Sequence, residues 1–274
     1  MRALGIIALS GTVALGIFRA QEQPPVAPPA PQPPPVLTYS GKPMTLPFRC
    51  TADDIQAAGL ACTEEDPCPV FLELSAVEST AIRIFAAGNI HTANANLYSV
   101  LLGTDDNGHT WREVADRVRG AGLDRIQFSG ADSGWASGQL LYPLPQDAFL
   151  VQTTDGGKSW RQHSIFSEPR LGAIQQFWFE DPKNGALIID NGPGSDGDRY
   201  ELYESRDGGD SWTVKETSVK PLKLRHAPPA PPPSEWRLRA DAASKSFHLE
   251  HRDGQRWTLV AAFSVALGAC KPPE

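Results

Sequence analysis

The sequence lacks an excess of basic side chains. Its 274 residues contain 25 Lys and Arg against 32 Asp and Glu, which gives a formal net charge of −7. A general binder of nucleic acid or of anionic membranes needs a basic face that neutralises phosphates. The composition therefore argues against both partners and leaves room only for a local basic patch. The six histidines show no metal-ligand spacing, so we expect neither a metal nor a cofactor.

Long segments with a helical period are also missing. From about residue 70 onward, short apolar or alternating runs are separated by clusters of Gly, Asp, Asn and Ser, which is typical of strands joined by turns. Only residues 51–59 resemble a helix, with Thr51 as N-cap, acidic residues in the first turn and Gly59 at the end. The pattern predicts an all-β fold with one short helix.

Only one long apolar run is present, from Ala3 to Phe18, and it follows Arg2. A positive start before an apolar stretch too short for a comfortable membrane span is typical of a secretory signal. Ala20 suits the position before a cleavage site, whereas Phe18 is bulky for the position two residues earlier. We expect an exported protein, periplasmic or extracellular, whose residues 1–20 are a signal peptide or an uncleaved anchor. Such an anchor would be its one membrane contact.

Cysteine is scarce, with Cys50, Cys62, Cys68 and Cys270 as the four copies. An even number in an oxidising compartment allows three disulfide pairings. Because three of them lie between residues 50 and 68, complete pairing must join Cys270 to that N-terminal segment. Such a long loop stabilises the fold by about 4 kcal/mol or more in the chain-entropy model. The alternatives are buried free thiols, or a zinc site, for which the spacing lacks a paired C-x-x-C.

A repeated octapeptide is the strongest pattern in the sequence. Residues 104–111, 153–160 and 205–212 all fit [ST]-x-D-x-G-x-[ST]-W, and residues 251–257 are an eroded copy that is one residue shorter. The aspartates of successive copies are 49, 52 and 46 residues apart. A period of this length is typical of one propeller blade per repeat.

These copies resemble the BNR or Asp-box repeat of sialidases, sortilin-like receptors, some glycoside hydrolases and the photosystem II assembly factor family. Residues 132–138, which include Gly134-Trp135-Ala136, resemble the "G-W-A-x-G" strand of the assembly-factor type. The resemblance covers roughly residues 70–260. It implies a small β-propeller of four, or five, four-stranded blades, in which each box is a hairpin turn between the third and fourth strands.

The chemistry of the box fits a structural turn. The Asp carboxylate accepts backbone N–H bonds, the Gly supplies a positive φ, and the Trp buries a large ring under the turn. Each copy has too few carboxylates for a calcium shell. The residues expected to have this structural role are Asp106, Gly108, Trp111, Asp155, Gly157, Trp160, Asp207, Gly209, Trp212, Asp253 and Trp257.

The repeats and the proline-rich segments divide the chain. Proline-rich sequence favours the polyproline II conformation, so it predicts a semi-rigid tether near the N-terminus and a long loop at 227–233. The fourth blade is one strand short, and residues 44–48 could supply that strand. The expected parts are the signal peptide or anchor at 1–20, a Pro-rich linker at 21–39, a Cys-containing segment with the short helix at 40–69, the propeller at 70–270 and a tail at 271–274.

Catalysis is not expected from these motifs. A sialidase needs an Arg-Ile-Pro motif, but Arg83-Ile84 is followed by Phe85. Any other glycosidase needs two carboxylates that face one cleft, and acidic residues at strand ends are more often solvated turns. The carboxylates available in the third blade are Glu180, Asp181, Asp190 and Glu201. We therefore assign no catalytic residue and keep a sialidase-like glycoside hydrolase as the alternative.

A non-catalytic binding or assembly module that acts on a protein or glycan partner in the cell envelope is the function expected from these observations. Propellers bind partners near their central axis, which the innermost strands face. For the adjacent glutamines, an amide pair satisfied inside the protein is the competing interpretation. The sequence does not indicate an oligomeric state. The candidate binding residues on the presumed inner strands are Arg125, Gln127, Gln175, Gln176, Trp178, Arg237 and Arg239.

Overall fold

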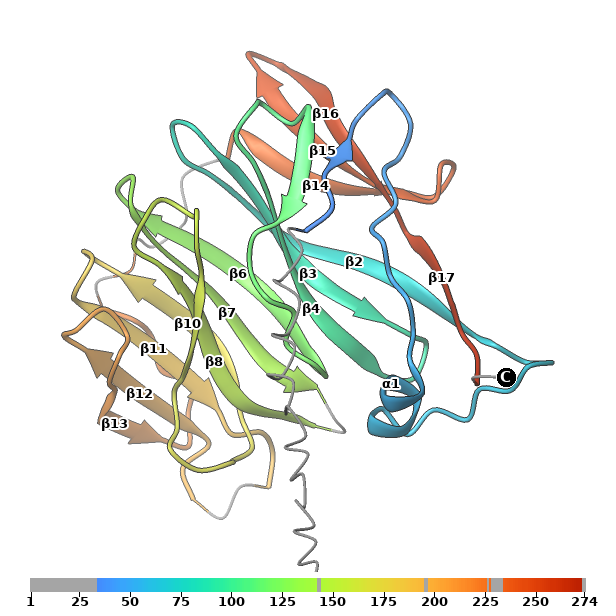
Figure 1. Cartoon of the computed structure of the whole chain (residues 1–274). Coiled ribbons are helices and arrows are strands. Elements are labelled where there is room, and N and C mark those ends of the chain that lie inside the picture. The colour runs from blue at the N-terminus through green and yellow to red at the C-terminus, as the bar shows by residue number, and fades with distance from the viewer. Residues whose placement is uncertain (1–33, 142–143, 195–196, 226, 228–233, 273–274) are drawn as a thin grey trace, which may run out of the picture. The chain divides into compact units, whose positions relative to one another are not determined.

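Strands dominate the computed structural model, which describes residues 34–141, 144–194, 197–225, 227 and 234–272 (Figure 1). The expected signal peptide or anchor and residues 21–33 of the Pro-rich linker lie outside the described residues, as do 228–233 and the last two residues of the tail. Within these described ranges, no helix is long and apolar enough to cross a membrane.

The strands form four antiparallel sheets, as expected from the repeats. The first sheet has the order β1-β5-β4-β3-β2-β17, with β1 (Leu37–Thr38), β2 (Cys68–Ser79), β3 (Ile84–His91), β4 (Asn96–Thr104), β5 (Thr110–Glu113) and β17 (Ala266–Cys270). The second contains β6 (Ala121–Ser129), β7 (Ser133–Leu141), β8 (Pro145–Thr153) and β9 (Arg161–Ser164). The third contains β10 (Ala173–Phe179), β11 (Gly185–Asp190), β12 (Tyr200–Ser205) and β13 (Thr213–Ser218), and the fourth β14 (Trp236–Asp241), β15 (Ser246–Asp253) and β16 (Arg256–Ser264).

The sheets pack in the manner of propeller blades, which confirms the predicted fold class. The fourth sheet contacts the first through β14 and β2, the first contacts the second through β2, β3, β4 and β6, and the second contacts the third through β10. In Figure 1 the first and second sheets accordingly lie between the third, drawn in yellow to brown, and the fourth, drawn in orange to red.

Buried apolar side chains fill each joint between neighbouring sheets. Burying one Leu or Phe side chain stabilises a fold by about 1.5–3 kcal/mol, so these joints hold the sheets together. The joint of the fourth and first sheets contains Leu72, Trp111 and Phe263, that of the first and second contains Phe85, Leu101 and Phe149, and that of the second and third contains Trp135, Phe179 and Leu187.

The strand count differs from the prediction of four per blade in two sheets. The first sheet gains β1 and β17, so the end of the segment that we assigned to the linker is part of the fold: Leu37 pairs with Trp111 and Thr38 with Thr110. The described fourth sheet has three strands. Met44 forms a parallel β-bridge with Phe263 at the edge of this sheet. Its N–H donates to the Ala262 carbonyl at 2.8 Å, and its carbonyl accepts the Ser264 N–H at 2.7 Å. Residues 44–48 thus supply a single bridge rather than a full strand.

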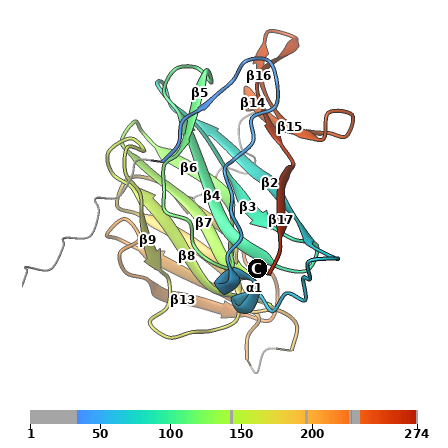
Figure 2. The same ribbon diagram turned by 45° about the vertical axis from the view of Figure 1, so that its right-hand side comes forward.

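The chain contains two disulfides, one of which connects the ends of its folded part. Cys50 is bonded to Cys270 and Cys62 to Cys68, so the expected link between Cys270 and the 50–68 segment is present. Figure 2 shows β17, drawn in red, beside β2, and the pairing places Cys270 opposite Cys68. The helix α1 (Ala52–Ala57) follows Cys50 after a single residue, Thr51, which is its N-cap as predicted.

Candidate functional site

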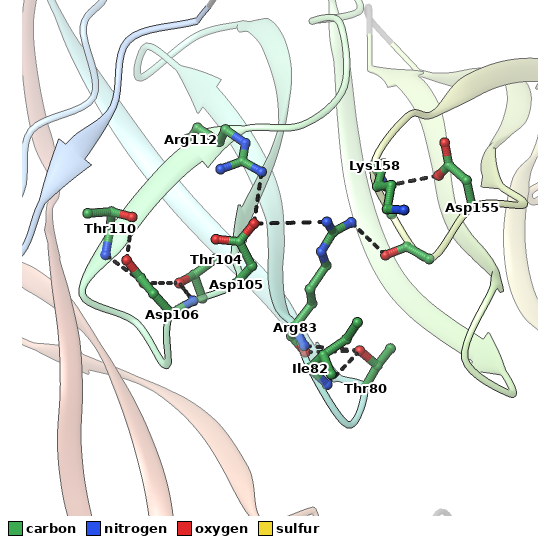
Figure 3. A network of polar contacts seen from close by, with 12 residues as sticks. Thr80, Ile82, Arg83, Thr104, Asp105, Asp106, Thr110, Arg112, Asp155 and Lys158 are labelled. Carbon is green, nitrogen blue, oxygen red and sulfur yellow. Dashed lines mark hydrogen bonds and ion pairs between the residues drawn. The ribbon is translucent and has the colours of Figure 1, made fainter.

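The Asp-box turns share one hydrogen-bond geometry, which Figure 3 shows for the first copy. The turn lies between β4 and β5, the third and fourth strands of its blade. Asp106 accepts the Thr104 hydroxyl at 2.8 Å, the Thr110 N–H at 2.8 Å and the Thr110 hydroxyl at 2.6 Å. The second and third copies repeat these contacts at Asp155 and Asp207. All three carboxylates are therefore occupied inside their own turns.

These bonds keep the carboxylates ionised. Burial raises the pKa of Asp106, but the hydrogen bonds from Thr110 and Thr104 outweigh it and lower that pKa to about 2. The hydrogen bonds from Ser211 lower the pKa of Asp207 to about 2 as well. Acids with depressed pKa values are poor proton donors at neutral pH.

Each of the three boxes also contacts the neighbouring sheet. Figure 3 shows Arg83 of the first sheet between the first and second boxes, where it donates to the Gly156 carbonyl at 2.9 Å and lies 3.9 Å from Asp105. A Cβ on Gly157 would lie 2.2 Å from the Phe85 ring. In the same way, Trp135 of the second sheet donates to the Gly208 carbonyl of the third box at 2.8 Å. The boxes are thus part of the joints between sheets.

The tryptophans of the boxes differ in burial. Trp111 is 1% exposed and donates to the Gly108 carbonyl at 3.0 Å. Trp160 and Trp212 are half-buried, and Trp212 donates to the Gly209 carbonyl at 3.1 Å. In the eroded fourth copy Asp253 is exposed, and Trp257 lies under the Arg237 guanidinium, 4.1 Å from the ring centroid. The fourth copy is therefore an ordinary hairpin whose Trp packs on the sheet face.

The predicted binding residues do not meet in one site. The side-chain amide of Gln127 donates to the Phe179 carbonyl at 2.7 Å and accepts the Phe179 N–H at 2.9 Å, so it joins β6 to β10. Gln175 lies at a β-bulge with its Oε1 buried and without a hydrogen bond among the described residues. Gln176 pairs with Ile188, whose side chain packs on the face of the third sheet away from the second. Arg125 is exposed on β6.

The two arginines of β14 lie in an ionic cluster on the fourth sheet. Arg237 and Arg239 both donate to the Glu250 carboxylate, at 2.6 and 3.1 Å. Arg239 also lies 3.3 Å from Asp241. These cations are neutralised by their own sheet, so they are unlike the free basic residues that an anionic ligand requires.

A cavity of about 740 Å³ lies at the strand ends opposite the Asp boxes. Its walls come from the loops β7–β8, β9–β10 and β11–β12, which extend from the second and third sheets. Leu144 and Leu171 stand at its edge and are 56% and 50% exposed. A cavity with exposed apolar side chains at its edge is a candidate surface for binding a partner.

The third sheet supplies the charged part of this cavity. Arg170 of the β9–β10 loop donates to both oxygens of Glu201, at 3.0 and 3.1 Å, and its guanidinium lies 4.5 Å from the Phe166 ring centroid. The Tyr203 hydroxyl donates to Glu201 at 2.6 Å. On the β11–β12 loop, Arg199 makes two bonds of 2.7 and 2.8 Å to Asp190. Arg199 binds its carboxylate in fork geometry through Nε and Nη2, whereas Arg170 reaches both oxygens of Glu201 through Nη2 alone. Both pairs hold the loops in position.

The ionisation of these groups is unsuited to proton transfer. Burial alone would raise the pKa of Glu201, but bonds from Tyr203 and Arg170 hold it below its usual value. The bonds from Arg199 likewise lower the pKa of Asp190. Burial and the bond to Glu201 raise the pKa of Tyr203 to about 12. A glycosidase needs one carboxylic acid with a raised pKa, and Glu78 on β2, where burial raises the pKa, is not a lining residue of this cavity.

Only the two acidic residues of this site were predicted from the sequence. Asp190 and Glu201 were recognised as available carboxylates, and the structure places both at the cavity. Arg170, Arg199 and Leu171 were not singled out, because they lie in loops without a repeated pattern. Among the residues that the structure describes, no three His, Cys, Asp or Glu side chains lie close enough together to hold a metal ion.

No protein-family model and no curated protein matches the sequence. Among solved structures, the chain is similar to YCF48 bound to D1 peptide, with a TM-score of 0.40 and 18% identity over 70% of this chain and 56% of that one. It is also similar to YCF48 from Cyanidioschyzon merolae, with a TM-score of 0.37 and 18% identity over 70% of this chain and 57% of that one. The chain spans little more than half the length of these YCF48 chains.

Proposed function

We propose that this protein is an exported, non-catalytic binding module that holds a segment of a partner protein of the cell envelope in the loop cavity. The observation that carries the proposal is the cavity of about 740 Å³ with Leu144 and Leu171 exposed at its edge. Loops held on a rigid sheet scaffold are where binding surfaces are usually found. A partner segment would bury the leucines and pair with backbone groups of the glycine-rich β11–β12 loop.

The chemistry of the lining supports a peptide as the occupant. Leu, Pro, Ala and Gly residues provide apolar contacts and accessible backbone, while Arg170 and Arg199 are already paired with Glu201 and Asp190. Because the charges are neutralised within the protein, affinity should come from apolar contact and backbone hydrogen bonds. Binding should therefore depend only weakly on salt, since screening acts on unpaired charges.

Peptide display on the purified protein tests this function. Peptides enriched on the wild type should lose about tenfold or more in affinity, about 1.4 kcal/mol, on a variant with Leu144→Asp and Leu171→Asp. Trp178→Ala, which changes a residue outside the lining of this cavity, serves as the matched control and should leave their affinity unchanged. Peptides that bind both variants as well as the wild type would contradict the assignment of the cavity.

The arrangement of Tyr203, Glu201 and Arg170 favours the sialidase-like alternative more than any other observation, since some sialidases use a Tyr nucleophile. Tyr203, however, is 5% exposed and has its pKa raised to about 12. We therefore expect no turnover of a fluorogenic sialoside or of neutral fluorogenic glycosides. Turnover by the wild type that Glu201→Gln or Asp190→Asn abolishes would replace the binding function with a hydrolase.

A further inference from the structure

The third sheet has a second cavity, of about 440 Å³, on its face away from the second sheet. Side chains of β10, β11 and β12 alternate between two faces. Phe177, Phe179 and Leu187 pack toward the second sheet, whereas Trp178 and Ala186 line this cavity on the other face together with Leu202. The register agrees, because Trp178 pairs with Ala186.

The chain that follows β13 forms the opposite wall. Leu222 and Leu224 pack against Ile188, Tyr200 and Leu202, and Leu224 lines the cavity. These contacts complete the apolar part of this sheet face. The cavity is therefore a cleft between the sheet and its own connecting segment, with an apolar floor.

Trp178 differs from the tryptophans that hold the joints. Trp111, Trp135 and Trp212 donate their indole N–H groups to glycine carbonyls. Within the described residues, Trp178 has neither such a bond nor a ring that stacks on it, and its side chain is half-buried in the cleft. An indole with an accessible face and a free N–H is able to serve as a platform for a ligand.

The rim of the cleft is strongly polar but balanced in charge. Lys215 lies 3.5 Å from Glu204, and Arg225 lies 3.5 Å from Glu216. The lining includes three acidic and three basic side chains, which are Glu180, Glu204, Glu216, Arg206, Lys215 and Arg225. Equal numbers of both signs give no net attraction for an anion or a cation, whereas they offer both donors and acceptors of hydrogen bonds.

From this geometry we propose that the cleft binds a neutral saccharide. The apolar C–H face of a sugar ring fits the Trp178 platform, and its hydroxyl groups pair with the carboxylates and cations of the rim. A charged ligand gains nothing from a rim without net charge. An additional sheet is not the occupant either, because packing one here would bury Glu204 and Lys215, and buried charges are costly. The proposal rests on this cleft alone and is independent of the loop cavity.

Isothermal titration calorimetry with defined sugars tests the proposal. The probes are cellobiose, maltotriose and diacetylchitobiose as neutral ligands, sialyllactose as the anionic control and the glucosamine dimer as the cationic control. We expect at least one neutral probe to bind, accompanied by a change in tryptophan fluorescence. Trp178→Ala should weaken that binding by about tenfold or more, and Trp178→Phe should retain it within about threefold because the ring face remains. Glu204→Gln should also weaken it, because an acceptor of the rim is lost.

The control is Leu171→Asp, which alters the loop cavity and should leave sugar binding unchanged. Melting temperatures of all variants show whether they fold. If Trp178→Ala does not fold, sugar binding by Trp178→Phe and Glu204→Gln still tests the proposal. The absence of binding to every neutral probe at millimolar concentration would overturn the proposal. Equal binding by Trp178→Ala, or tighter binding of a charged sugar than of a neutral one, would overturn it too. Since peptide affinity depends on Leu144 and Leu171, the failure of one site is distinguishable from the failure of the other.

Discussion

The carboxylate of each of the three full Asp boxes accepts at least three hydrogen bonds. Asp155 accepts bonds from the Thr153 hydroxyl, from the N–H groups of Lys158 and Ser159, and from the Ser159 hydroxyl. Hydrogen bonds to a charged group each contribute about 1.5–3 kcal/mol at most. The aspartate that defines the motif is thus a stabilising residue.

A substitution series tests that role. Asp155→Ala should lower the free energy of unfolding by about 1–3 kcal/mol, measured by urea denaturation. Asp253→Ala is the matched control, because Asp253 is exposed and accepts no hydrogen bond from the described residues. It should change the free energy by less than about 0.5 kcal/mol. Equal effects of both substitutions would be inconsistent with a stabilising box carboxylate.

The same carboxylates predict how stability depends on pH. The folded pKa values of Asp106 and Asp207 are about 2, below the ordinary value of 3.8. A group whose pKa is lowered by folding contributes stability that is present above about pH 4 and is lost as the pH falls toward 2. Urea denaturation between pH 5 and pH 2 should therefore show a falling free energy of unfolding. A variant with Asp106→Asn and Asp207→Asn should show a flatter profile over that range, and an unchanged profile would contradict the assignment.

At the scale of elements, each box turn packs on a neighbouring sheet: the first box on the fourth sheet, the second on the first and the third on the second. Gly157 has a φ of +81°, and a Cβ there would meet the Phe85 ring of the first sheet at 2.2 Å. Gly108 of the first box would meet Val260 of the fourth sheet at 2.4 Å in the same way. The glycine is needed for close approach between sheets as well as for the turn.

Two alanine substitutions separate these requirements. Gly157→Ala and Gly254→Ala both place a side chain at a positive φ, but nothing lies within 4 Å of the Cβ position at Gly254. We expect Gly157→Ala to cost about 1–3 kcal/mol more than Gly254→Ala because of overpacking against Phe85. Thermal unfolding of the two variants measures the difference. Equal melting temperatures would show that the turn conformation, and not the close approach between the sheets, requires glycine at position 157.

The elements were predictable from sequence to a large extent, because the boxes recur at blade spacing and locate the hairpins. The contacts between sheets were not predictable, since nothing in the sequence around Arg83, Phe85 and Trp135 indicates which turn each of them contacts. The pairing of β17 with β2 was not predicted either, although the expected link of Cys270 to the 50–68 segment brings the C-terminus to this part of the chain. Gln127 illustrates the limit for candidate sites, because its polarity suggested a ligand and its amide instead joins two strands.

At the scale of the whole molecule, the disulfide between Cys50 and Cys270 closes the chain over 220 residues, whereas Cys62 and Cys68 close only six. In the chain-entropy model the long loop contributes about 5 kcal/mol and the short one about 2 kcal/mol. Replacing the first pair by alanines should therefore destabilise the fold more than replacing the second pair, as urea denaturation would show. The reverse order would mean that the bond is not a clasp of the chain ends.

The two cavities lie at different parts of the third sheet: the loop cavity at its strand ends and the cleft around Trp178 on one of its faces. The loop cavity uses Arg170, Asp190 and Glu201 to fix its walls, and the cleft around Trp178 uses balanced charges at its rim. At the loop cavity, the bonds that lower the pKa values of Glu201 and Asp190 make these two acids unsuited to proton transfer, in line with the binding function that we propose. Glycan and protein partners would then occupy different surfaces of one propeller-like body.

Hydrogen–deuterium exchange with a peptide selected by display tests the central claim most directly. If the loop cavity is the protein-binding site, the peptide should slow exchange in the loops β7–β8, β9–β10 and β11–β12 and leave the Asp-box turns at the opposite strand ends unchanged. Slower exchange confined to the Asp-box turns, with no change in these three loops, would contradict the account.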